Sequence, residues 1–299
     1  MSTAVAPTRG VFNARVTENT PLCREHWRFT VEVDDFPQAA PGAFLQIQCS
    51  DPAGDLGSGA TFIRRPFSIA GLRRNGNRCA LDVIHRAVGP GTRWLSKLQP
   101  GDAVSILGPL GQAFPFRNDL SNVYMVGGGV GLPPLIWLAE ALHAAGQSPI
   151  AFVGSRSSDL VPLTRVDGLD VNGLDGSLAY EEFARSAVPT VLSTDDGSLG
   201  AAGRIPDVFA AYLDRHKPTA ADTIVYTCGP ELMMKAVANA CAVRSITCMV
   251  CLERVMACGM GTCQSCVVGV RDPAATNGWR YRLCCTDGPV FDSKIVIWE

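Results

Sequence analysis

The chain has 299 residues, enough for two or three domains of ordinary size. Hydrophobic residues make up 47% and charged residues 18% of it, which allows a sizeable core and excludes wholesale disorder. The formal net charge is -2, without a long run of Lys or Arg, so nucleic acid and anionic membranes are excluded as main partners.

The predicted cellular compartment does not by itself explain the high cysteine content. Residues 1–16 lack the basic and then apolar pattern of a signal peptide, and no apolar stretch is long enough for a spanning helix, so we predict a cytoplasmic protein. Twelve cysteines are many for that compartment, where disulfides are rarely maintained. Five are scattered and are predicted to be small core residues, whereas seven lie between Cys248 and Cys285 and favour a metal site.

The first part of the chain, residues 10–117, consists of short apolar segments separated by turn signals such as Pro-Gly and Asn-Gly-Asn. This punctuation predicts a small β-barrel rather than alternating strands and helices. Residues 51–61 are expected to form a loop inserted between two strands. The predicted strands cover residues 29–33, 43–49, 67–71, 79–87 and 103–108.

Two segments of this barrel have the residue types that a flavin needs. Arg65 offers a cation for a pyrophosphate, Phe67 an aromatic surface and Ser68 a hydrogen bond, all from one extended segment. Gly91 and Thr92 end a Gly-Pro-Gly-Thr turn before a short helix, a second candidate phosphate cradle. Taken alone, both patterns are modest.

After residue 118 buried strands alternate with helical segments, which predicts an open and mainly parallel sheet. The strands are expected at residues 122–129, 149–156, 189–194 and 223–230. The helices are expected at residues 132–146, 181–187 and 231–241.

Three loops leave the carboxyl ends of these strands, where open α/β sheets bind ligands. The glycine turn at residues 127–131 opens a helix, whose free N–H groups and dipole favour a phosphate. Asp195 and Asp196 follow another strand, and residues 228–230 follow a third. The glycine spacing is not G-x-G-x-x-G, so dinucleotide binding and a purely structural turn both remain open. A solvated turn likewise remains open for the two carboxylates.

The cysteine-rich tail begins at about residue 247. Cys258, Cys263 and Cys266 have the C-x4-C-x2-C spacing that is typical of a plant-type 2Fe–2S cluster. Cys284 or Cys285 would supply the fourth thiol. The glycines between the first two cysteines let the loop wrap so that backbone N–H groups face the sulfurs.

A structural zinc site is the alternative interpretation of the tail. Cys248 with Cys251, and Cys263 with Cys266, form two C-x2-C pairs, and four thiolates in a tetrahedron suit zinc. This alternative leaves Cys258 unused and does not explain the flanking glycines, so the iron–sulfur interpretation is preferred.

The order of the motifs is more specific than any one of them. Arg-Pro-Phe-Ser, Gly-Pro-Gly-Thr, VGGGVGLPPL and CGPELM, followed by MACGMGTCQSC and CTDGPVFDS, resemble the ferredoxin reductase superfamily. Over nearly the whole chain they resemble its branch of NAD-dependent dihydroorotate dehydrogenase electron-transfer subunits. The resemblance implies an FAD-binding β-barrel at residues 1–117, a Rossmann-like NAD domain with a parallel sheet at 118–246 and a small 2Fe–2S domain at 247–299. The departures are residues 51–61, residues 272–279 and His85, where the family commonly has tyrosine.

The resemblance also implies an oxidoreductase function in pyrimidine (UMP) biosynthesis. A separate catalytic subunit with FMN would oxidise dihydroorotate, and electrons would pass through the 2Fe–2S cluster and FAD of this chain to NAD+. The implied assembly is a heterotetramer. The rivals are a reductase subunit of the same architecture that serves another partner, such as a ferredoxin:NADP reductase or an oxygenase reductase, and a non-catalytic zinc-stabilised nucleotide-binding module.

No nucleophile or acid–base arrangement is evident, so no catalytic side chain is predicted. In the family the fourth cluster ligand stands directly before x-Asp-Gly-Pro-Val-Phe, which is Cys285 here, so the implied cluster ligands are Cys258, Cys263, Cys266 and Cys285. The implied flavin and nicotinamide residues are Arg65, Pro66, Phe67, Ser68, Ile84, His85, Arg86, Gly91, Thr92, Gly127, Gly128, Gly129, Gly131, Asp195, Asp196, Cys228, Gly229 and Pro230.

Overall fold

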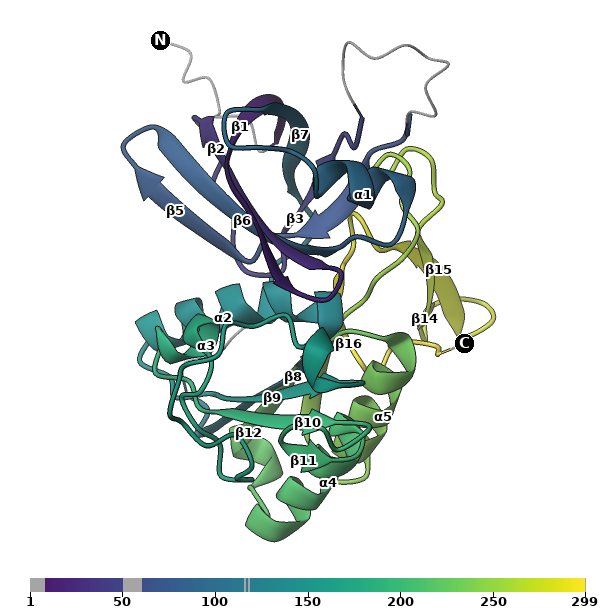
Figure 1. Cartoon of the computed structure of the whole chain (residues 1–299). Coiled ribbons are helices and arrows are strands. Elements are labelled where there is room, and N and C mark those ends of the chain that lie inside the picture. The colour runs from purple at the N-terminus through teal and green to yellow at the C-terminus, as the bar shows by residue number, and fades with distance from the viewer. Residues whose placement is uncertain (1–8, 51–60, 116, 118, 299) are drawn as a thin grey trace.

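The computed structural model describes residues 9–50, 61–115, 117 and 119–298, which form two lobes with a small hairpin beside them (Figure 1). All but the last residue of the predicted insertion at 51–61 lies outside the described residues. Within the described ranges, no helix has both the length and the apolar character needed to cross a membrane.

The N-terminal lobe is a curled antiparallel sheet, which confirms the predicted barrel class. Its strand order is β4-β3-β7-β1-β2-β6-β5, and its inward face buries large side chains such as Phe29, Leu45 and Ile106. The helix α1 (Pro90–Leu95) follows β6. The strands are β1 (Gly10–Cys23), β2 (His26–Asp34), β3 (Phe44–Ile47), β4 (Arg65–Ser68), β5 (Gly71–Asn75), β6 (Arg78–Arg86) and β7 (Ala103–Leu110).

The second lobe is an α/β layer structure, as the alternation of strands and helices predicts. Its strand order is β11-β10-β9-β8-β12-β13-β16, and only the last pair is antiparallel. The strands are β8 (Asn122–Gly128), β9 (Ile150–Ser155), β10 (Thr190–Thr194), β11 (Ala201–Ala202), β12 (Thr223–Cys228), β13 (Thr247–Cys251) and β16 (Val290–Asp292).

Helices cover both faces of this sheet. The helix α2 (Leu132–Ala144) lies between the sheet and the barrel, and α4 (Ile205–His216) and α5 (Glu231–Ala242) pack on the opposite face (Figure 1). The helix predicted at residues 181–187 is only one turn long, α3 (Glu181–Ala184), and turn residues follow it as far as Ala187, which has a positive φ of 51°. The helix α4 was not predicted.

Only part of the cysteine-rich tail is structurally separate from the α/β lobe. The strands β14 (Val267–Arg271) and β15 (Trp279–Leu283) form a two-stranded hairpin of their own. In contrast, β13 and β16 belong to the parallel-sheet lobe, so a boundary at residue 247 divides that sheet. A boundary just after β13 follows the strand pairing better.

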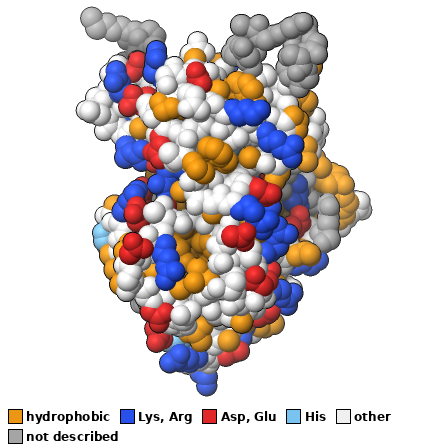
Figure 2. Space-filling view, viewed as in Figure 1, with side chains coloured by type: hydrophobic (Ala, Val, Ile, Leu, Met, Phe, Trp, Pro, Cys, Tyr) orange, Lys and Arg blue, Asp and Glu red, His pale blue; other side chains and the backbone are white. Residues whose placement is uncertain are grey.

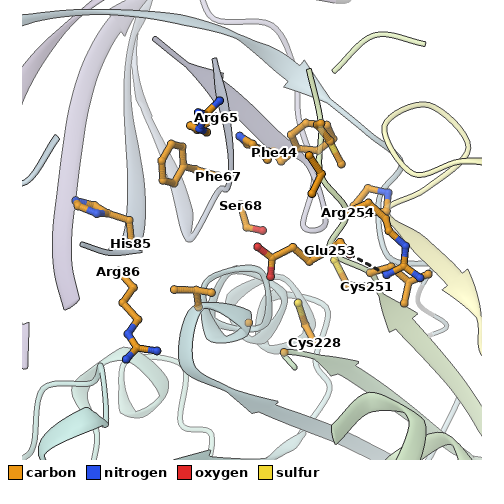
Figure 3. Close-up of a pocket in the computed structure, with 18 of the residues that line it drawn as sticks. Phe44, Arg65, Phe67, Ser68, His85, Arg86, Cys228, Cys251, Glu253 and Arg254 are labelled. Atoms are coloured by element: carbon orange, nitrogen blue, oxygen red, sulfur yellow. Dashed lines mark hydrogen bonds between the residues drawn. The ribbon is translucent and has the colours of Figure 1, made fainter. Parts of the chain in front are cut away.

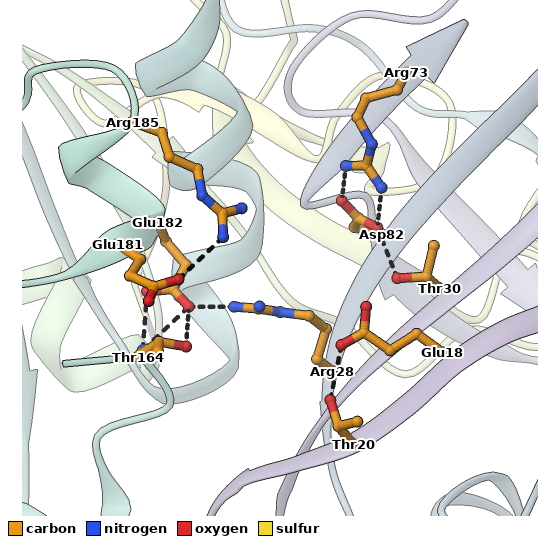
Figure 4. Close-up of polar contacts among 10 residues, drawn as sticks. All are labelled: Glu18, Thr20, Arg28, Thr30, Arg73, Asp82, Thr164, Glu181, Glu182 and Arg185. Carbon is orange, nitrogen blue, oxygen red and sulfur yellow. Dashed lines mark hydrogen bonds and ion pairs between the residues drawn. The ribbon is translucent and has the colours of Figure 1, made fainter. Parts of the chain in front are cut away.

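A buried ion pair joins the two lobes. Arg28 of β2 donates to the Glu182 carboxylate of α3, which is 4% exposed (Figure 4). The Thr164 backbone N–H and hydroxyl donate to the same carboxylate over 2.9 Å each. A buried charge is tolerated when it is paired and hydrogen-bonded in this way. The pair therefore links the barrel to the α/β lobe.

On the face shown in Figure 2, the described side chains form no large patch of one sign. Basic and acidic side chains are interspersed over the face of both lobes in Figure 2, in agreement with the net charge of -2.

Candidate functional site

A large cavity lies where the two lobes and the tail meet. It has a volume of about 1050 Å³, at the upper end of the range for ligand pockets, and suits an extended dinucleotide such as FAD (Figure 3). Its walls come from β4, the end of β6, the loop after β12 and residues 251–257. The predicted residues that line it are Arg65, Pro66, Phe67, Ser68, Ile84, His85, Arg86, Thr92, Gly131, Cys228, Gly229 and Pro230.

The strand β4 presents the predicted flavin motif to this cavity. All four of its residues are half-buried, because β3 pairs with one edge while the other side faces the cavity. Arg65 donates to the Ile63 carbonyl over 2.9 Å, and no carboxylate pairs with it among the described residues. Its charge is therefore available for a phosphate.

His85 contributes a neutral ring to the cavity wall rather than a charge. Its ring is 1% exposed and packs edge-on against Phe29 and Phe67, with centroid distances of 6.4 and 6.1 Å. Burial and, to a smaller extent, the neighbouring His26 lower the pKa of His85 to about 4, so the ring is neutral at pH 7. Neither ring nitrogen has a partner among the described atoms.

A second cavity of about 470 Å³ lies at the carboxyl ends of the parallel strands. Gly128, Gly129 and Asp195 line it, as predicted for a nicotinamide dinucleotide site, and residues 229 and 230 lie between it and the larger cavity. The glycines let the backbone segments touch: a Cβ at Gly128 would stand 2.7 Å from the Gly154 carbonyl oxygen.

Three of the predicted flavin and nicotinamide residues line neither cavity. Gly91 packs on Cys49, where a Cβ would stand 2.9 Å from the cysteine Cβ, and Gly127 is covered in the same way by Leu135. Asp196 accepts the Ser198 backbone N–H over 3.0 Å and so stabilises its own turn. In this structure the two glycines serve close packing, and Asp196 serves its own turn.

The phosphate cradle predicted beside Gly91 is partly occupied by the chain itself. The Thr92 hydroxyl lies at the larger cavity but already accepts the backbone N–H groups of Val88 and Gly89, over 3.0 Å each. Thr92 therefore caps α1.

Glu253 is the main cavity residue that the sequence did not reveal. It lines both cavities, and its carboxylate points into the larger one beside Ser68 and Cys228 (Figure 3). The next residue, Arg254, pairs instead with Glu231 over 2.9 Å. Its position could have indicated a role, because Glu253 follows the end of β13 at the same sheet edge as the other loops.

The four predicted cluster ligands come together in the tail as two pairs of thiols. Cys263 contacts Cys258, whose sulfur accepts the Cys263 backbone N–H over 3.4 Å. Cys285 contacts Cys266, whose sulfur accepts the Cys285 backbone N–H over 3.4 Å. The Cys285 thiol also lies near Cys258. The loop of residues 258–266, here called the cluster loop, thus already turns backbone donors toward sulfur.

This pairing fits two irons better than one zinc ion. In the described part of the chain, no three His, Cys, Asp or Glu side chains lie close enough to share one metal ion. A structural zinc ion needs four ligands around it, whereas a 2Fe–2S cluster takes two thiolates at each iron.

The zinc alternative also fails at its other cysteine pair. Cys248 contacts Cys241 of α5, while Cys251 contacts Cys228 of β12. The two thiols thus lie in hydrophobic clusters on opposite faces of the sheet. Alternation along β13 places residues three apart on opposite sides, so they cannot hold one metal together.

Cys263 is the thiol of the cluster loop that is best prepared for metal. Its sulfur lies 3.2 Å from the Ser265 hydroxyl. Hydrogen bonds from Ser265, and then from Cys258, lower the pKa of Cys263 to about 6. Because the thiolate is the metal-binding form, this site favours metal binding at neutral pH.

Comparisons with known proteins identify matching domains. The family described as the iron-sulfur cluster binding domain of dihydroorotate dehydrogenase B matches residues 253–297, and the siderophore-interacting FAD-binding domain matches residues 36–113. The chain therefore contains an FAD-binding and an iron–sulfur domain, and the iron–sulfur match begins just after β13.

Relatives along the whole chain carry one name. The dihydroorotate dehydrogenase B (NAD(+)) electron transfer subunit of Desulforamulus reducens is 31% identical, and the alignment covers 97% of this chain and 99% of that protein. The protein of the same name from Bacillus caldolyticus is 33% identical over 86% of each chain.

Solved structures support the fold. A chain of the NADH-dependent reduced ferredoxin-NADP oxidoreductase superposes with a TM-score of 0.75 and 25% identity, over 100% of this chain and 92% of that one. Phthalate dioxygenase reductase superposes with a TM-score of 0.57 and 17% identity, over 88% and 87% of the two chains, which shows a shared fold.

Proposed function

Because the chain belongs to the electron transfer subunits of NAD-dependent dihydroorotate dehydrogenase B, we propose that it passes electrons from a dihydroorotate-oxidising partner to NAD+. The partner is the FMN-containing catalytic subunit, the complex is a cytoplasmic heterotetramer, and the pathway is pyrimidine biosynthesis. The chain is thus the electron-transfer component of an oxidoreductase.

One observation carries the proposal: the paired thiols adjoin the same cavity as the flavin motif. Residues 251–257 and Ser265 line that cavity, and the cluster loop begins directly after residue 257. A 2Fe–2S cluster supplies one-electron exchange, and FAD supplies exchange between single electrons and hydride. Bound at these sites, the two groups would lie side by side, which supports the proposal.

The chain's own residues would divide the work of binding. Arg65 would neutralise the flavin phosphates, and Phe67 and Ser68 would contact the ring system. Gly128, Gly129 and Asp195 would hold the nicotinamide dinucleotide in the smaller cavity. The loop at residues 228–230 borders both cavities, so the nicotinamide would reach the flavin across it.

The assembled complex tests the function directly. Dihydroorotate should reduce NAD+ when this chain is purified with its partner. In the isolated chain NADH should bleach the flavin absorbance, whereas dihydroorotate should not. Bleaching by dihydroorotate without a partner would overturn the two-subunit assignment. A complex that reduces ferredoxin or an oxygenase but does not respond to dihydroorotate would favour the rival reductases.

Arg65→Ala should weaken FAD binding by about 1.5–3 kcal/mol, or roughly 10- to 150-fold, because a charged hydrogen bond to phosphate is lost. Arg78→Ala is the matched control, since Arg78 is 64% exposed, forms only long ion pairs with Glu32 (3.8 Å) and Asp34 (3.9 Å), and does not line the cavity. FAD affinity is measured by fluorescence recovery on release. Equal affinity in the two variants would remove Arg65 from the binding site.

A further inference from the structure

A buried glutamine of the barrel lacks any hydrogen-bond partner. Gln46 lies in β3, between Pro66 of β4 and Leu107 of β7 in the strand pairing. Its side chain is 0% exposed, and neither Oε1 nor Nε2 has a partner among the described residues. Buried amides are almost always hydrogen-bonded, so this one is expected to meet a group that the protein binds.

The Gln46 amide lies against the cluster loop. A Cβ built on Gly259 would stand 2.7 Å from Gln46 Cγ and 2.9 Å from Nε2. Gly259 has a φ of +73° and follows the predicted ligand Cys258. Because it has no side chain, the amide reaches the loop backbone next to that ligand. Gln46 does not line the larger cavity, so the loop, and not the flavin, is its neighbour.

The barrel also holds the other ligand-bearing segment in place. Gln112, which follows β7, donates from its side chain to the Thr286 carbonyl over 2.8 Å. Its backbone N–H donates to the Gly288 carbonyl over 2.6 Å. The segment after Cys285 is thus hydrogen-bonded to the same lobe that carries Gln46. These contacts fix the position of the Gln46 amide relative to the ligand-bearing segments.

We propose that the Gln46 side chain donates a hydrogen bond from Nε2 to a sulfur of the iron–sulfur centre at Cys258 and raises its reduction potential. A donor at sulfur stabilises the reduced cluster, which carries the extra negative charge, more than the oxidised one. Gln46 is a positioning and tuning residue, mounted on the strand that pairs with the flavin motif. The inference rests on the proposed iron–sulfur function.

Gln46→Met tests the inference, because it keeps the length of the side chain and removes the donor. Leu110→Ala is the control: Leu110 Cδ1 would stand 3.1 Å from the same Cβ at Gly259, so this variant loosens the loop without touching a donor. In redox titrations followed by EPR, Gln46→Met should shift the cluster to lower potential and Leu110→Ala should not. Pulsed EPR should lose a nitrogen coupling only in Gln46→Met.

A second measurement keeps Gln46 in place, in case the Gln46→Met variant misfolds. Glutamine side chains are labelled with 15N, and Gln264 of the cluster loop is replaced by asparagine (Gln264→Asn) so that its own side chain does not contribute a labelled nitrogen near the cluster. The nitrogen coupling to the reduced cluster should change with the label. An unchanged coupling, or an unchanged potential in folded Gln46→Met, would overturn the hydrogen bond alone. A wild-type protein without a 2Fe–2S spectrum would instead overturn the proposed function.

Discussion

Cys285→Ala should lose the 2Fe–2S absorbance and EPR signal and should stop electron transfer from the partner, while NADH still reduces FAD. Removing one of four thiolates leaves an iron without its full ligand set. The flavin is unaffected because Cys285 lines neither cavity. The expected loss is complete for the cluster signal and small for NADH-dependent flavin bleaching.

The adjacent thiol is the matched control. Cys284 is fully buried and donates to the Leu252 carbonyl over 3.3 Å, and burial raises the pKa of its thiol well above the usual value. A buried thiol of this kind behaves as a small apolar residue. Cys284→Ala should therefore keep the cluster, with a stability loss of about 1 kcal/mol.

Iron and sulfide content, the visible spectrum and EPR of the two variants decide the assignment. A cluster that survives in Cys285→Ala and disappears in Cys284→Ala would move the ligand to Cys284. Intact four-thiolate clusters in both variants would exclude this segment as the source of the fourth ligand.

The sequence predicted the modules well, because each has a strong local signal. Strand punctuation identifies the barrel, alternation identifies the parallel sheet, and the cysteine spacing identifies the cluster loop. The spacing predicted three of the ligands but not the arrangement of the four thiols as two pairs, which depends on how Cys285 returns to Cys266. The resemblance, and not the spacing, selected Cys285 over Cys284.

Local composition misled where tertiary packing decides. The cysteines of β13 suggested that the tail begins at residue 247, yet they are buried strand residues of the sheet. The helix α4 was overlooked although Ile205, Val208, Phe209, Tyr212 and Leu213 follow a helical period. That pattern predicts a helix at these residues.

Long-range contacts were beyond the reach of the sequence. The position of Glu253 after β13 placed it at the sheet edge, but nothing local shows that its carboxylate would point into the cavity or that Gln46 would meet Gly259. Both arrangements depend on how the barrel packs against the rest of the chain, and the buried pair of Arg28 and Glu182 is one contact between the barrel and the α/β lobe. Residues that reach a site only through such packing belong to no motif that the sequence spacing would reveal.

Gly131→Ala should damage both the fold and nucleotide binding, because two loops touch at this glycine. A Cβ there would stand 2.2 Å from the Cys228 carbonyl oxygen and 2.4 Å from the Gly229 nitrogen. These are backbone atoms and cannot turn aside, so the glycine turn and the loop at residues 228–230 must separate. The cost should exceed the ~1–3 kcal/mol of ordinary overpacking, and NADH affinity should fall at least about tenfold.

Gly129→Ala separates this steric effect from backbone strain in the same turn. Gly129 has a φ of +56° but open space where its Cβ would be, so alanine should cost only the ~1–2 kcal/mol of a left-handed conformation. Denaturant unfolding gives the stability of each variant, and flavin bleaching at varied NADH gives nucleotide affinity. The test rests on stability, because Gly129 also lines the smaller cavity and an added methyl group there would meet the nucleotide directly. Close packing of the two loops makes Gly131→Ala the less stable variant, and the opposite order of unfolding free energies would show that the turn and the loop at residues 228–230 are not in contact.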